Sequence, residues 1–179
     1  GLPIVWAKAA FAYIPFCESC DQWTKRTPSV ATLSSESADE LATALEKGQF
    51  DIIDSAHSVD AGFIKKYTAK ERKKVEKALE KARKNKDENP EAYRAALAAP
   101  ARRNKRQYLN IDVFRCPRCS DSSYITLERV VITPDNDKND IETKATLIKH
   151  LKVSDAELAK IEAANRRSAP EQTETDEPS

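Results

Sequence analysis

The chain has 179 residues, of which 33% are charged and 40% are hydrophobic, and its net charge is +1. This length and apolar content predict one domain with a modest core and appended pieces. Four cysteines are too few for a secreted domain built on disulfides, which favours a reducing, cytoplasmic compartment. The three glycines form no phosphate-binding loop and the serines match no nucleophile motif, so the sequence indicates no catalytic residue and no small-molecule substrate.

The N-terminal segment, residues 1–16, is apolar apart from Lys8. It contains Pro3 and Pro15 and is shorter than the roughly 20 apolar residues that cross a bilayer. Two interpretations stay open. The segment packs on the domain as a first helical turn or strand, or the chain begins just after a membrane-spanning helix and is tethered to a membrane through it.

The cysteines form two Cys-x-x-Cys pairs, Cys17 with Cys20 and Cys116 with Cys119. One such turn lets two thiolates converge on an ion, and two turns supply the four sulfurs of a tetrahedral structural zinc site. A strand-like apolar run precedes each pair, at residues 11–16 and 108–114, and the second run alternates as a half-buried strand does. The pattern therefore predicts one structural Zn²⁺ held by all four cysteines.

At residues 9–33 and 107–133 the chain resembles the zinc-ribbon (rubredoxin-like knuckle) family, and Cys116-Pro117-Arg118-Cys119 is the more typical turn. The resemblance implies a small antiparallel sheet around the metal. The usual spacer between the pairs is about 15–20 residues, whereas residues 21–115 intervene here. We therefore expect a large insertion between the ribbon halves. The chain is also loosely similar to the cytosolic ribbons of bacterial multi-pass membrane proteins, which implies an anchor upstream of Gly1.

The cysteines have other possible uses besides zinc binding. A Cys-x-x-Cys motif can act as a thiol-disulfide oxidoreductase, but such a motif normally opens a helix in a βαβ unit. Neither pair here precedes an amphipathic helix, and one redox motif would not explain a second pair. A closed four-sulfur site has no open position for substrate, which argues against metal catalysis.

The region between the pairs is predicted to be helical because it carries capping signals. Capping boxes at Ser37–Glu40 and Thr68–Glu71 predict helices over residues 38–47 and 69–86, and Asn89 with Pro90 predicts a third helix, over 90–99. Residues 50–63 are expected to form a short helix or an irregular packing segment. After the second pair, residues 124–132 predict a strand and residues 141–153 a strand or short helix. A capping box at Ser154–Glu157 begins a final helix.

The predicted fold class is α+β: a small antiparallel zinc-ribbon sheet with a helical insertion between the knuckles and a C-terminal helix. The predicted parts are the first ribbon half (1–35), the basic helical insertion (36–106), the second ribbon half (107–153), the C-terminal helix (154–167) and a disordered acidic tail (168–179).

Charge is distributed unevenly along the chain. Residues 64–106 contain 16 Lys or Arg and 6 Asp or Glu, a net of +10, which leaves −9 for the remainder. Three interpretations of this basic segment stay open. It forms an ordinary solvated helical face, it binds nucleic acid, or it binds an anionic membrane or a partner protein. Its candidate contact residues are Lys70, Lys73, Lys74, Lys77, Lys81, Lys84, Arg102, Arg103, Lys105 and Arg106.

These observations favour a non-catalytic, zinc-stapled interaction or scaffold domain whose partner is a protein. The alternatives are a nucleic-acid-binding zinc ribbon and a Cys-x-x-Cys oxidoreductase. We further expect the metal to fix the basic helices relative to the sheet.

Overall fold

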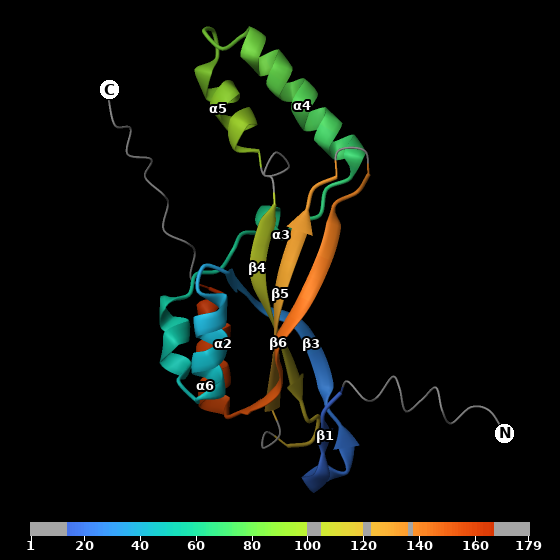
Figure 1. Ribbon diagram of the computed structural model, residues 1–179, viewed down its shortest axis with the longest axis vertical. Helices are drawn as coiled ribbons and strands as arrows, with labels where there is room; N and C mark the ends of the chain where they lie inside the picture. The colour runs from blue at the N-terminus through green and yellow to red at the C-terminus, as the bar shows by residue number, and fades with distance from the viewer. Residues whose placement is uncertain (1–13, 100–104, 120–122, 136–137, 167–179) are drawn as a thin grey trace, which may run out of the picture.

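In a computed structural model, residues 14–99, 105–119, 123–135 and 138–166 are described. They form the expected α+β fold, drawn out along one axis (Figure 1). A four-stranded sheet occupies the middle, a small β-hairpin lies at one end, and a helical hairpin projects from the other.

The sheet is fully antiparallel in the order β3-β4-β5-β6, with strands Lys25–Ser34, Arg106–Arg115, Ser123–Thr133 and Ile141–Val153. β3 is an edge strand and contains Pro28. Its register against β4 shifts between Thr27 and Ala31. Ser29 adopts a φ of 51° in this bulge. Pro28 is tolerated in the bulge because a residue there does not need a backbone amide to pair with β4. β6 confirms the strand interpretation of residues 141–153.

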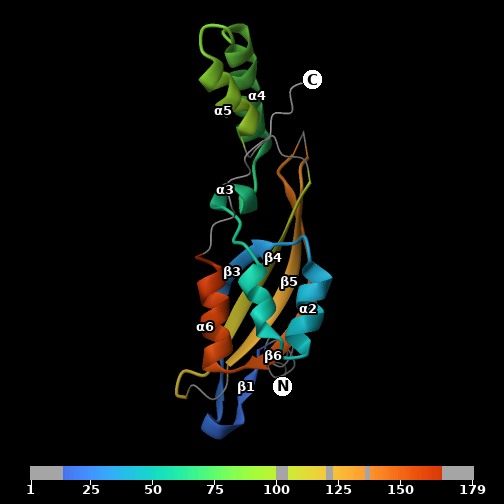
Figure 2. The same cartoon turned by 90° about the vertical axis from the view of Figure 1, so that its left-hand side faces the viewer.

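One face of the sheet is covered by helices α2 (Ala38–Glu46) and α6 (Asp155–Ala164) and by the 3₁₀ segment η2 (Phe50–Ser55) (Figure 2). Every second residue of β4 points into this layer, so Leu109, Ile111 and Val113 are almost fully buried. The core is completed by side chains from the covering elements, including Leu41, Leu45, Phe50, Ile53, Leu158 and Ile161. The predicted insertion thus contributes part of the sheet's own core.

The other face of β4 is buried as well, which the expected half-buried alternation did not predict. Tyr108 packs with Val130 and Ile132 in a second apolar cluster. The short helix α3 (Ala61–Ile64) and Val59 lie against this cluster. Farther along the same face, Asn110 and Asp112 are buried and hydrogen-bonded to each other.

Helices α4 (Ala69–Lys84) and α5 (Pro90–Ala98) form the projecting hairpin, and they pack mainly on each other (Figures 1 and 2). The Thr68–Glu71 capping box begins α4 as predicted. Asn89 caps α5, since its side chain accepts a hydrogen bond from the Ala92 amide at 3.0 Å. These local signals were correctly interpreted because each one satisfies helix-end amides without help from distant residues.

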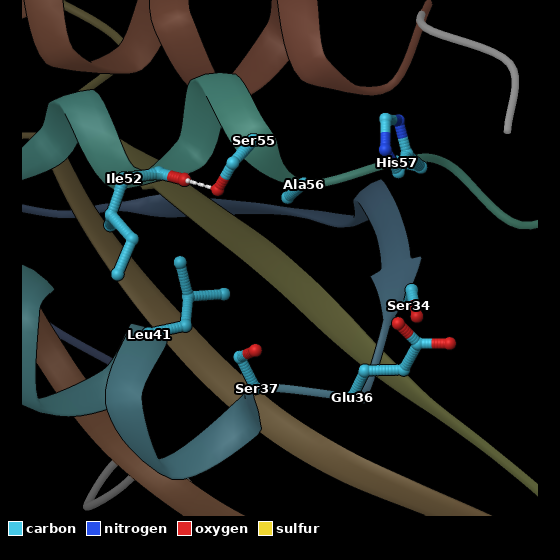
Figure 3. Close-up of a pocket in the computed structure, with 8 residues that line it drawn as sticks. All are labelled: Ser34, Glu36, Ser37, Leu41, Ile52, Ser55, Ala56 and His57. Carbon is cyan, nitrogen blue, oxygen red and sulfur yellow. Dashed lines mark hydrogen bonds between the residues drawn. The ribbon is translucent and has the colours of Figure 1, made fainter. Parts of the chain in front are cut away.

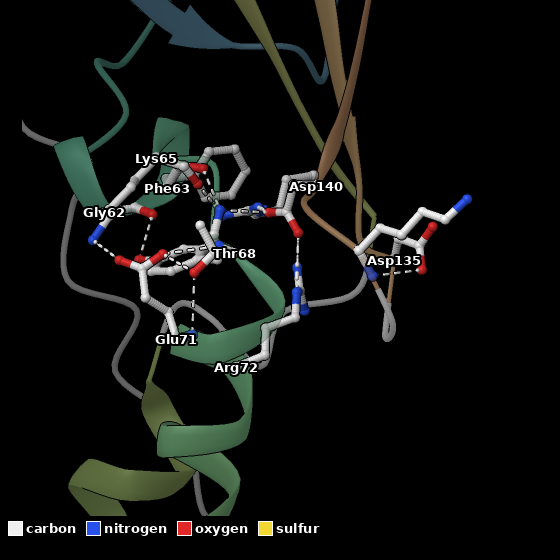
Figure 4. Close-up of polar contacts among 11 residues, drawn as sticks. Gly62, Phe63, Lys65, Thr68, Glu71, Arg72, Asp135 and Asp140 are labelled. Carbon is white, nitrogen blue, oxygen red and sulfur yellow. Dashed lines mark hydrogen bonds and ion pairs between the residues drawn. The ribbon is translucent and has the colours of Figure 1, made fainter.

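The base of this hairpin is tied to the sheet by a buried ion cluster around Asp140 (Figure 4). The Asp140 carboxylate accepts hydrogen bonds from Arg72 of α4 and Arg106 of β4, and its side chain is fully buried. It also accepts the Tyr67 amide at 3.0 Å, and the Asp140 amide donates to the Tyr67 carbonyl. Chain segments far apart in sequence therefore meet at one carboxylate.

Some expectations need correction or fall outside the described residues. Ser37 precedes α2, but its side chain makes no capping hydrogen bond. Its φ of −119° and ψ of 38° are not the extended conformation of an ordinary N-cap, so the predicted capping box there is wrong. The tail 168–179 and the first half of the expected strand at 11–16 lie outside the described residues. In the described half of that run, only Phe16 belongs to a strand, at the start of β1. The proposed division into five parts stays a prediction.

Candidate metal centre

The first knuckle is a tight β-hairpin. β1 (Phe16–Cys17) pairs with β2 (Gln22–Trp23), and the 3₁₀ turn η1 (Glu18–Cys20) joins them. Asp21 takes the left-handed conformation, φ 51°, which short polar residues tolerate better than most. Because the turn is this tight, Cys17 and Cys20 are carried on one loop.

The second knuckle, residues 116–119, lies between β4 and β5. The pairing of β3 with β4 begins at Lys25 opposite Arg115, immediately next to Cys116. Since β3 follows the first knuckle and β4 leads into the second, this pairing brings both knuckles to the same end of the sheet. Sheet register, rather than proximity in sequence, assembles the four cysteines.

The four Sγ atoms all lie within 4.8 Å of one another. Cys17 and Cys119, from different knuckles, are 3.6 Å apart. A tetrahedral ion with metal–sulfur bonds of about 2.3 Å places neighbouring sulfurs about 3.8 Å apart, so the arrangement matches a four-sulfur site. All four cysteines are free thiols, Cys17 and Cys116 buried and the other two half-buried. The cysteines are thus positioned to bind one metal ion.

The contacts around the cluster affect the charge state of its sulfurs. The Arg118 amide donates to Cys116 Sγ at 3.5 Å, as amides in a knuckle do for a metal-bound sulfur. Hydrogen bonding to Cys119, then burial and the neighbouring Cys116 and Cys17, raises the pKa of the Cys20 thiol to about 12. Crowded thiols resist losing their protons one by one, and a divalent cation would offset the repulsion between the resulting thiolates.

Neither histidine joins the cysteine cluster. His150 stacks edge-on against Phe114 at a centroid distance of 5.1 Å, on the sheet. His57 is exposed and lines a hollow of about 90 Å³ between α2 and η2 (Figure 3). Ser55 in this hollow donates its hydroxyl to the Ile52 carbonyl. The Ser34 amide donates to the His57 carbonyl at 2.9 Å. Among these described lining residues, no serine hydroxyl is hydrogen-bonded to the His57 ring, so the hollow presents no activated nucleophile.

The basic residues predicted to contact an anionic partner differ in their exposure to solvent. Six lysines of α4 and Lys105 are exposed, as expected for a surface contact. Arg106, however, is only 2% exposed, and its guanidinium binds Asp140 and the carbonyls of Lys65 and Phe63. Its assignment as a contact for an anionic partner is therefore wrong. Arg102 and Arg103 lie outside the described residues.

The expected link between the metal and the basic helices also needs correction. The knuckles and the α4–α5 hairpin lie at opposite ends of the molecule (Figure 1). The hairpin is attached instead through Arg72 and Asp140. A metal ion would therefore fix the two Cys-x-x-Cys turns to each other, and the ion cluster fixes the hairpin to the sheet.

Two sets of long-range ion pairs were not predicted from the sequence. Asp140 binds arginines 68 and 34 positions away. Asp112 binds Arg26, 86 positions away, and accepts the Ser29 amide at 2.8 Å. An isolated aspartate beside a strand or within it carries no local signal, so only the sheet register could have revealed these pairs.

No family model, no curated protein and no solved structure matches the chain. Within the described residues, no helix has both the length and the apolar character needed to cross a bilayer. The cysteine geometry therefore carries the functional argument by itself.

Proposed function

We propose that this protein is a non-catalytic interaction platform in which a single structural Zn²⁺ staples two ribbon halves together. The observation that carries the proposal is the convergence of four free thiols, from loops about 100 positions apart, within 4.8 Å. Zinc suits four thiolates because it accepts tetrahedral sulfur coordination and has no redox chemistry of its own. The Zn²⁺ leaves no coordination position for a substrate once four sulfurs are bound.

The metal ion would hold the β1–β2 hairpin to the main sheet more firmly than hydrogen bonds alone. β1 and β2 are two residues each, and the exposed Trp23 packs edge-on against Phe16 at 5.0 Å. So small a hairpin is marginal in water without further support. A bound ion anchors it to the β4–β5 end of the main sheet, which gives the platform a rigid end.

Iron is the main rival for the same ligands, since four sulfurs in a tetrahedron also hold iron. Metal analysis of protein purified without added metal separates the two. We expect about one zinc per chain, no visible absorbance, and four thiols that become titratable only after chelation in denaturant. One iron per chain with visible absorbance would show that the bound metal is iron and not zinc. An absence of metal, with thiols appearing only after reduction, would overturn the proposal in favour of a thiol-disulfide oxidoreductase.

A further inference from the structure

The outward face of helix α4 carries a continuous row of lysines. At 100° and 1.5 Å per residue, these side chains fall within an arc of about 100° and extend along about 21 Å of the helix. We call this row the lysine stripe: Lys70, Lys73, Lys74, Lys77, Lys81 and Lys84.

The lysine stripe is not neutralised by the protein itself. All six side chains are exposed, and Lys84 alone pairs with an acidic residue in the described part of the chain, Glu80 at 3.6 Å. The remaining acidic residues of α4, Glu71 and Glu76, lie outside the arc. Glu71 is engaged by Lys65 and by the cap of its own helix. The row therefore presents up to six positive charges to solvent.

The orientation of the stripe is set by the fold. The opposite side of α4 bears Val75, Leu79 and Ala82, which are half-buried in the hairpin. Arg72 on that side is buried and bound to Asp140. Because the buried ion pair fixes the rotation of α4 at its base, the lysines are held on the side away from the packing stripe, on a hairpin that projects from the body (Figure 1).

We infer that the lysine stripe binds the phosphate backbone of a duplex nucleic acid without reading its sequence. A straight row of cations spaced by one helical turn suits a linear array of phosphates. The face has no arginine, asparagine or glutamine with which to read base edges. It also has no aromatic residue on which single-stranded bases could stack, because Tyr67 lies against Arg106 and Tyr93 against Lys86.

A membrane fits this surface less well. Helices that lie in a bilayer interface bury an apolar face in the lipid, and the apolar face of α4 packs in the hairpin instead. The inference goes beyond the proposed zinc platform, because it concerns the end of the molecule away from the cysteines (Figure 1).

The test is fluorescence anisotropy of the zinc-loaded full chain with a labelled 24-base-pair DNA duplex, a matching RNA duplex and a single strand. The test variant is K70Q/K74Q/K77Q/K81Q. The control, K25Q/K47Q/K138Q/K152Q, removes the same charge from exposed lysines elsewhere. Zinc content and thermal unfolding of each variant are measured in parallel, so that loss of the metal platform is seen separately from loss of binding.

We expect the chain to bind duplex more tightly than single strand, and the test variant to bind more than tenfold more weakly than the control at about 100 mM salt. Each phosphate contact contributes about −0.9 to the slope of log K against log salt, so the test variant should lose about 3 to 4 units of slope. The inference is overturned if both variants lose the same duplex affinity, if the chain binds single strand more tightly than duplex, or if it binds no nucleic acid. Stripe-dependent binding to vesicles containing 30% phosphatidylserine, without duplex binding, would assign the surface to a membrane instead.

Discussion

The Sγ atoms of Cys17 and Cys119 lie 3.6 Å apart although 102 positions separate them in the chain. They meet because β3 and β4 pair in antiparallel register from the knuckle end of the sheet. An ion at this point would connect the two Cys-x-x-Cys turns directly. The consequences for stability can be measured.

Replacing Cys116 by serine should abolish metal binding and lower the melting temperature of the whole domain. Serine does not replace a thiolate ligand for zinc, and structural zinc contributes about 10 to 16 kcal/mol of apparent binding free energy in small peptides. Circular dichroism on heating, with metal analysis, checks this. The matched control is Ser19→Ala in the first knuckle, which should keep the metal. An unchanged melting temperature in Cys116→Ser would remove the staple.

Removing the charge of Asp140 should destabilise the protein by about 3 to 5 kcal/mol, because Asp140→Asn leaves the buried Arg72 and Arg106 uncompensated. Asp51 gives the control: its side chain is 87% exposed and binds Lys160. Asp51→Asn should cost no more than about 1 kcal/mol, as for other surface ion pairs. Urea unfolding of the metal-loaded variants measures both values. Similar costs for the two variants would contradict a structural role for the Asp140 cluster.

Two serines that precede helices should respond differently to alanine. Ser154 accepts the Glu157 amide and completes a capping box with the Glu157 side chain. Ser154→Ala should therefore cost about 1 kcal/mol. Ser37 makes no side-chain cap, so Ser37→Ala should cost less than about 0.5 kcal/mol. Denaturant unfolding of the two variants measures both losses of stability. An equal loss in Ser37→Ala and Ser154→Ala would show that Ser37 caps α2.

Glu71 should stay ionised at pH values where an ordinary glutamate protonates. Hydrogen bonds from Thr68 and the nearby Lys65 lower its pKa to about 2. Because the folded pKa is depressed, the stabilisation of the first turn of α4 is present above about pH 4.5 and is lost as the pH falls toward 2. The carboxyl ¹³C shift of Glu71 should therefore stay constant from about pH 6 to pH 4.

A Glu71 titration midpoint near the ordinary glutamate value of about 4.3 would show that the capping box does not hold the charge.

Much of the fold follows from short-range patterns. These patterns involve residues that are neighbours in sequence: the Cys-x-x-Cys turns, the caps at Thr68, Asn89 and Ser154, and the β-rich run at residues 124–132. The structure confirms the elements that they predict. The capping box at Ser37 failed although its residue pattern is the same. The conformation of the chain entering α2 is set by its attachment to β3, and a four-residue motif does not contain that information.

The sequence by itself determined which residues can bind a metal, where most helices begin, and that positive charge is concentrated in residues 64–106. Only the tertiary structure decided that Arg106 is buried against Asp140, that the hairpin lies far from the knuckles, and that six lysines share one exposed face. The physical reason is distance along the chain. Periodicity and capping act within a turn or two, whereas strand register brings together groups 34 to 102 positions apart.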